Sequence, residues 1–212
     1  MKYTFNIDPR TKIEDIDKLD VPVGVQFTGD FTEESAAKFR SELNVAEYAA
    51  RLSGQDIIPI TIDSYGGDVY ALMSCLDAVD ACSLPVATIV EGKAMSAGAF
   101  LFAYGKQGHR YVAPGATLMY HSAQYFAYGK HEEIKNSAKA IEFLQKRMFE
   151  RVSKRIGKPL DWLDQKLMEQ RHLDWYLSPE EAVELGFANH IGVPVMNVEI
   201  KMTHSFALPP TK

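Results

Sequence analysis

The sequence predicts an α/β fold with a parallel sheet, because strand-like and helix-like stretches alternate along it. Residues 57–62 form a mostly apolar run, the turn 63–68 follows, and residues 69–82 then place apolar side chains at helical spacing. Residues 83–85 interrupt this helix, and residues 86–90 form a second β-rich run. A strand, a turn, a helix and a strand make a βαβ unit, whose strands are parallel and whose crossover is right-handed.

The first part of the chain adds a strand and a long helix. We expect residues 1–20 to form an N-terminal arm and residues 21–28 to form a strand that ends at Gly29. Thr32 can cap the helix that follows, and Gly54 is a typical residue for its end. Pro59 removes one hydrogen-bond donor from the next strand, which predicts that it lies at a sheet edge or a bulge.

The second part repeats the alternation. The strand that begins at residue 86 ends at Gly92, and small residues then surround Ser96. The further elements predicted are a helix over 99–105, a strand over 116–120, a long helix over 132–156, a short helix over 160–168, an extended segment over 171–177 and a helix over 178–186. Ser178, Glu181 and Gly186 give the last helix a capping box and a terminating glycine.

Composition favours one globular domain. The 212 residues are 46% hydrophobic and 24% charged, and we assign the domain to residues 21–192 with a C-terminal extension at 193–212. The net charge of -5 argues against nucleic acid as a partner. No apolar run approaches the roughly 20 residues that span a bilayer, and the first residues lack the apolar core of a signal peptide. These features predict a cytoplasmic protein without a membrane partner.

The two cysteines, Cys75 and Cys82, are seven residues apart on one predicted helix. Their Cα atoms would be about 10 Å apart at the rise of an α-helix, which is too far for a disulfide. Neither they nor the histidines have the spacing of a metal site. The sequence therefore predicts no metal and no cofactor.

Four features point to one site. The carboxyl ends of parallel strands meet at one crevice, so the Gly66-Gly67 turn and the Ser96 turn should be neighbours, and His121 ends the next strand. Asp174 precedes the last helix beside two aromatic side chains that can shield it from water. Each residue also has a plainer interpretation: Ser96 as a helix cap, His121 as a surface or structural histidine, and Asp174 as a structural carboxylate.

Four segments together resemble one known family. They are Ser64-Tyr65-Gly66-Gly67, residues 94–101 around Ser96, Leu118-Met119-Tyr120-His121, and residues 174–186 beginning Asp174-Trp175-Tyr176. In this order and with this spacing they resemble the proteolytic subunit of the caseinolytic (Clp) serine proteases, from about residue 21 to residue 191.

The resemblance implies the Clp/crotonase fold, with repeated ββα or βαβ units and a protruding long helix, here residues 132–156. It implies Ser96 as nucleophile, His121 as base, Asp174 as the group that orients the base, and the backbone N–H groups of Gly67 and Ala97 as an oxyanion hole. It also implies a homo-oligomer of stacked rings with the active sites inside, peptide or unfolded protein as substrate, and a separate ATP-driven (AAA+) unfoldase. The chain has no Walker A motif, so any use of ATP would belong to that partner.

The sequence departs from the family pattern around the site. Tyr65 stands where the family has proline, Met95 and Ala97 replace its alanine and methionine, and Ser122-Ala123 replaces its Gln-Pro. A divergent branch, such as one carried by phages or prophages, is one setting for these changes. Two alternatives stay open: a crotonase-type acyl-CoA enzyme, and a catalytically silent ring subunit.

Overall fold

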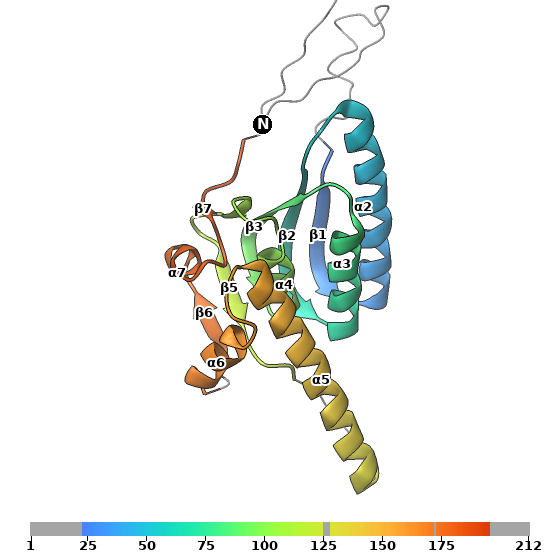
Figure 1. The fold of residues 1–212 in the computed structure, drawn as a ribbon, viewed down its shortest axis with the longest axis vertical. Coiled ribbons are helices and arrows are strands. Elements are labelled where there is room, and N and C mark those ends of the chain that lie inside the picture. The colour runs from blue at the N-terminus through green and yellow to red at the C-terminus, as the bar shows by residue number, and fades with distance from the viewer. Residues whose placement is uncertain (1–22, 125–127, 172, 196–212) are drawn as a thin grey trace, which may run out of the picture.

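The protein is built on a seven-stranded, mostly parallel sheet (Figure 1). The structure, a computed structural model, describes residues 23–124, 128–171 and 173–195. Its strands are β1 (Val25–Phe31), β2 (Ile58–Gly67), β3 (Val86–Met95), β4 (Arg110–Val112), β5 (Thr117–Tyr120), β6 (Trp175–Leu177) and β7 (His190–Ile191). Its helices are α2 (Glu33–Ser53), α3 (Val69–Ala81), α4 (Ala97–Ala103), α5 (His131–Arg155), α6 (Trp162–Glu169) and α7 (Pro179–Leu185).

The strand order β1-β2-β3-β4-β7 is parallel throughout. Beyond β4, β3 continues and pairs in parallel with β5, and β5 pairs with β6 in antiparallel fashion. Helices α2 and α3 lie side by side next to β1 (Figure 1). The predicted α/β class and the predicted parallel pair of β2 and β3 are therefore confirmed.

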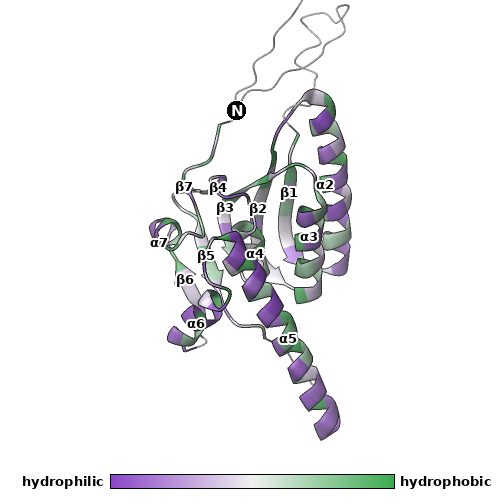
Figure 2. Ribbon diagram, in the orientation of Figure 1, coloured by the Kyte–Doolittle hydropathy of each residue, from purple (hydrophilic) through white to green (hydrophobic). Residues whose placement is uncertain are grey.

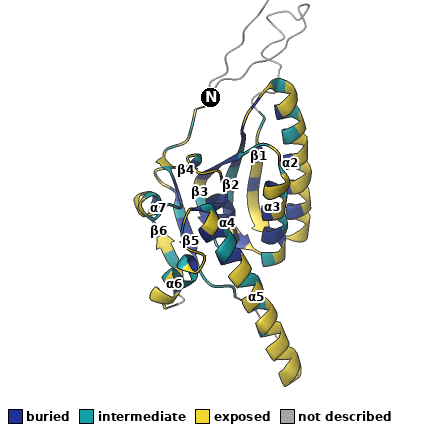
Figure 3. Cartoon of the chain, in the orientation of Figure 1, coloured by how far each residue is buried: buried dark blue, intermediate teal, exposed yellow. Residues whose placement is uncertain are grey.

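Burial concentrates in α4 and in the strands β2, β3, β4 and β5 (Figure 3). All seven residues of α4 are buried, because this helix packs against β2, β3 and β5. The buried residues of β2 and β3 are mainly Ile, Val and Ala; the first half of β3 is buried continuously, whereas β2 alternates between buried and partly exposed residues. Because the site lies at the start of α4, its backbone is held by the best-packed part of the domain.

Helix α5 projects beyond the rest of the domain (Figure 1). Its buried residues, Met148, Phe149, Val152 and Ser153, all lie near its C-terminal end. The projecting end is mostly hydrophilic, with some hydrophobic residues between (Figure 2), and Ile134 and Phe143 are exposed on it. In the part of the chain that the structure describes, no helix is long and apolar enough to cross a bilayer.

The prediction that Pro59 lies at an edge or a bulge is wrong, because Pro59 lies in β2, between β1 and β3, and pairs in register with Ala87. The backbone N–H of Ile58 donates to Pro85 on the β3 side, so the missing donor of Pro59 would have faced the β1 side. There, pairing with β1 begins only one residue later, at Val25 opposite Ile60. The proline therefore breaks no ladder hydrogen bond.

Three predicted boundaries are also wrong. Strand β1 runs to Phe31 instead of ending at Gly29, because a register shift between Thr28 and Asp30 lets the chain pass this point and pair with β2 again. Strand β3 runs through Gly92 to Met95, and α4 begins directly after Ser96 instead of at Ala99. Strands β4 and β7 were not predicted, because they are too short to show a periodic pattern.

Helix capping agrees with the prediction. Thr32 and Ser35 form a capping box at the start of α2, and Gly54 ends this helix in the left-handed conformation. Ser178 and Glu181 form the predicted capping box of α7. The predicted arm at residues 1–20 and the extension beyond residue 195 lie outside the described residues.

Candidate active site

Ser96 lies between the end of β3 and the start of α4, in a backbone conformation that is rare for a residue with a side chain. Its φ is 50° and its ψ is -122°, and Ser96 N donates to Met119 O over 2.8 Å. Such a conformation costs about 1–3 kcal/mol and persists where the surrounding structure enforces it. Ser96 occupies the N-cap position, but its hydroxyl makes no capping hydrogen bond. The hydroxyl therefore points away from the first N–H groups of α4.

The partner of this hydroxyl is His121. The distance from His121 Nε2 to Ser96 Oγ is 2.7 Å, and the imidazole is mostly buried. His121 directly follows β5, which pairs in parallel with the end of β3. This pairing places the residue after β5 next to the residue after β3, as the shared-crevice argument predicts.

Asp174 approaches the other side of the imidazole. In the antiparallel pair of β5 and β6, Tyr120 lies opposite Trp175, so His121 and Asp174 extend from the same end of the pair. Asp174 Oδ1 lies 3.8 Å from His121 Nδ1, which is longer than a hydrogen bond. The expected shielding by two aromatic side chains is wrong: the Asp174 side chain is 46% exposed, because Tyr176 itself lies exposed on this three-residue strand.

The Gly66-Gly67 segment passes very close to Ser96. A Cβ on Gly66 would lie 2.6 Å from Ser96 Cβ and 3.1 Å from Ala97 N, and one on Gly67 would lie 2.5 Å from Phe31 O. The two glycines have φ of 108° and 139°, which side chains disfavour. Only glycine fits here, so the backbone can face the space above the serine hydroxyl.

Ser64 holds this segment in place. Its buried hydroxyl donates to Gly29 O over 2.6 Å and accepts from Gly66 N over 3.0 Å. The hydroxyl thereby ties β1 to the glycines of β2. Ser64 lies in the Ser64-Tyr65-Gly66-Gly67 motif, and nothing in the sequence alone indicates this supporting role.

These residues line one cavity of about 550 Å³. Ser96, Gly67, Ala97, His121 and Asp174 all lie on its wall. The rest of the wall is largely apolar, with Val69, Leu72, Phe100, Met119, Ile141 and Met148. The structure thus brings together all five residues that the sequence analysis selected, beside a surface that can hold apolar side chains.

Two residues that the sequence analysis missed support the site from behind. The hydroxyl of Tyr120 donates to Ala99 O over 3.0 Å, and complete burial raises the pKa of this phenol well above its ordinary value. Gln145 on α5 accepts a hydrogen bond of 2.7 Å from Ala123 N, two residues after His121. Neither contact could be predicted from neighbouring residues, because each joins segments more than 20 positions apart in the sequence.

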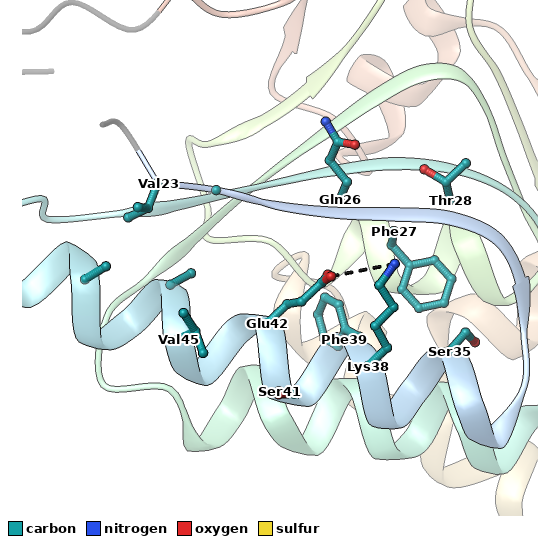
Figure 4. A pocket seen from close by; sticks show the side chains of 13 residues that line it. Val23, Gln26, Phe27, Thr28, Ser35, Lys38, Phe39, Ser41, Glu42 and Val45 are labelled. Atoms are coloured by element: carbon teal, nitrogen blue, oxygen red, sulfur yellow. Dashed lines mark ion pairs between the residues drawn. The ribbon is translucent and has the colours of Figure 1, made fainter. Parts of the chain in front are cut away.

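A second cavity, of about 750 Å³, lies between β1 and α2 (Figure 4). An ion pair of 3.7 Å joins Lys38 and Glu42 within it. Its lining residues include no histidine, cysteine or aspartate, and the one carboxylate among them, that of Glu42, is paired with Lys38. Over the residues that the structure describes, no group of three or more His, Cys, Asp or Glu side chains could hold a metal ion.

The parallel sheet and the Ser96–His121 contact define an α/β protein in which a serine hydroxyl and an imidazole meet at one cavity. The family model for Clp protease matches residues 10–194. The chain therefore belongs to the Clp protease family, and its fold is the Clp/crotonase fold that the sequence predicts. Membership of this family implies that the protein is a peptidase. The family generally forms oligomeric rings and handles protein substrates.

Proposed function

We propose that this protein is a serine endopeptidase in which Ser96 is the nucleophile, His121 the general base and Asp174 the residue that orients the base. The observation that carries the proposal is the 2.7 Å contact between His121 Nε2 and Ser96 Oγ. The strained φ of Ser96 supports it, because a serine presented on such a turn exposes its hydroxyl to a cleft.

The chemistry follows from these residue types. His121 removes the proton of the Ser96 hydroxyl as its oxygen attacks a peptide carbonyl, and it then donates this proton to the departing amine. Water, activated by the same imidazole, releases the acyl group from Ser96. The N–H groups of Gly67 and Ala97 stabilise the negative oxygen of each tetrahedral intermediate, and one such donor contributes about 3 kcal/mol in serine proteases.

The proposed working form is a homo-oligomer of stacked rings that encloses the sites. The projecting end of α5, with exposed Ile134 and Phe143, is a surface that a second copy can cover. A separate ATP-driven unfoldase would deliver large substrates. We place the protein in the cytoplasm, since Cys75 and Cys82 are both free, as is usual in a reducing compartment.

A fluorophosphonate probe tests the proposal, because it reacts with an activated serine hydroxyl. We expect mass spectrometry of the labelled, assembled protein to place the probe on Ser96, and labelling to disappear in Ser96→Ala and His121→Ala. Ser41→Ala, a change of an exposed serine on α2, is the matched control and should keep full labelling. A folded and assembled protein that never labels would overturn the proposal.

The two alternatives have different outcomes in this experiment. A crotonase-type enzyme would bind acyl-CoA without labelling. It needs an acidic side chain near the backbone amides, and Asp68, which directly follows Gly67 and lines the cavity, already accepts a hydrogen bond from Ala71 N. A catalytically silent ring subunit is favoured by one observation, the long distance between His121 and Asp174. It would assemble and neither label nor cleave peptides.

A further inference from the structure

Tyr65 is an aromatic side chain at the wall of the cavity that the mechanism does not use. It lies on β2, one residue before the two close-approach glycines, and it lines the same cavity as Ser96 and His121. The residue is 67% exposed and belongs to neither the buried core nor the partly buried shell packed against it. Packing therefore does not explain a large aromatic ring at this position.

The ring is nevertheless held by Lys93, which is itself paired with Asp63. The ammonium of Lys93 lies 4.2 Å from the centroid of the Tyr65 ring and 2.7 Å from Asp63 Oδ1. Asp63 and Tyr65 are two residues apart on β2 and so point to the same face of the sheet. The hydrogen bond to Asp63 raises the pKa of Lys93, so the ammonium stays charged across the neutral range.

A bulge in the sheet aims Lys93 at these partners. The pairing of β2 and β3 shifts register between Ile62 and Ser64, and extra residues of β3, including Gly92 and Lys93, stand opposite Asp63. Gly92 has a φ of 82°, which favours glycine, and its Cα faces the Asp63 carboxylate. Bulges next to active sites commonly re-aim a side chain. This bulge directs a cation onto Tyr65.

We propose that Tyr65, fixed by Lys93, forms a subsite that selects an aromatic or bulky apolar substrate side chain at one position beside the cleaved bond. This inference rests on the proposed peptidase function. A ring held in one orientation stacks on a planar or apolar group with little loss of side-chain freedom. The ammonium of Lys93 is paired with Asp63, so its part is to hold the ring and not to repel a charged substrate side chain.

Cleavage of a peptide library by the full-length assembled protein tests the subsite, with products identified by mass spectrometry. We expect wild type to prefer Phe, Tyr or Leu over Ala by roughly tenfold at one position next to the cleaved bond. Tyr65→Ala should lose this preference at that position and keep the others, and Tyr65→Phe should retain it. Lys93→Met, which keeps the apolar stem and removes the cation that holds the ring, should weaken this preference without abolishing it.

Tyr48→Ala is the matched control, because Tyr48 is 69% exposed on α2 and does not line the cavity. Fluorophosphonate labelling of Ser96, measured in every variant, separates the two hypotheses. Labelling together with an unchanged cleavage profile in Tyr65→Ala overturns the subsite alone. Absence of both labelling and cleavage in assembled wild type overturns the proposed function and the subsite with it.

Discussion

The carboxylate of Asp174 lies 3.8 Å from His121 Nδ1, whereas Nε2 of the same imidazole lies 2.7 Å from Ser96 Oγ. The imidazole is therefore hydrogen-bonded to Ser96 through Nε2 but not to Asp174 through Nδ1. Because the Asp174 carboxylate is about half exposed, water screens its charge, and its electrostatic interaction with the imidazole is weaker than that of a buried, hydrogen-bonded aspartate.

We expect Asp174→Asn to reduce kcat/KM on a short peptide by much less than the roughly 10⁴-fold seen where the triad aspartate hydrogen-bonds the histidine. Steady-state hydrolysis by the assembled protein measures this, with Ser96→Ala as the reference for complete loss. A loss of the full size would mean that the carboxylate closes onto His121 during turnover.

Gln145 should act as a positioning residue. Its side chain accepts from Ala123 N, so Gln145→Leu leaves that N–H without its partner and loosens the segment that carries His121. We expect kcat to fall roughly tenfold with little change in KM. Gln145→Glu keeps an acceptor oxygen and should restore kcat.

Gln165→Leu is the control for this prediction, because Gln165 makes an exposed contact with Asp161 on α6. If Gln145→Leu lowered the unfolding midpoint but left kcat unchanged, the role of Gln145 would be structural only.

Arg110 should be a main support of the second half of the domain. Its buried guanidinium donates to Phe187 O over 2.9 Å, Gly186 O over 2.9 Å and Gly105 O over 3.1 Å, and burial lowers its pKa to about 10. Arg110→Met leaves these carbonyls without donors, and we expect a loss of about 3–5 kcal/mol in the free energy of unfolding. Urea denaturation measures the loss.

The control for Arg110 is Arg51→Met, in the exposed last turn of α2, which should change stability by about 0.5 kcal/mol. Equal effects of the two substitutions would contradict a supporting role for Arg110.

His109 should make stability depend on pH. Burial, and then the positive charges of Lys106 and His190, lower the pKa of His109 below its ordinary value of 6.5, against a weaker opposing effect of Asp56. The unfolded chain therefore binds a proton more readily than the folded one, and stability falls as pH falls below about 6.5. The urea midpoint should drop between pH 7.5 and pH 5.5, and less so in His109→Gln.

His131→Gln changes an exposed histidine at the start of α5 and should leave the pH dependence as in wild type. An unaltered pH dependence in His109→Gln would show that other groups cause it.

Local patterns in the sequence predicted the elements that are long or clearly capped. The helix ends at Gly54 and Gly186 depend on nearby residues alone, and the same is true of the capping boxes of α2 and α7. The convergence of Ser96 and His121 was also predictable, because it follows from the rule that carboxyl ends of parallel strands share a crevice.

What the sequence did not reveal depends on pairing between distant segments. Pro59 is tolerated in a central strand only because the pairing of β2 with β1 begins at Ile60, one residue after the proline. Where this pairing begins depends on both strands and not on the sequence of β2 alone. The contact of Gln145 with Ala123 joins a helix to a loop 22 positions away. The bulge that brings Lys93 to Tyr65 is likewise a matter of register, which no single strand encodes.

The strained backbone of Ser96 has a consequence for how such a protein can lose its activity. A glycine at this position would remove the hydroxyl and at the same time relieve the unfavourable φ of 50°. Under the proposed function this chain would be inactive, yet it would fold at least as well as the active one, and neither chaperones nor proteases would single it out. The stability of the fold therefore does not require serine at this position, and only selection for the reaction itself can retain the hydroxyl.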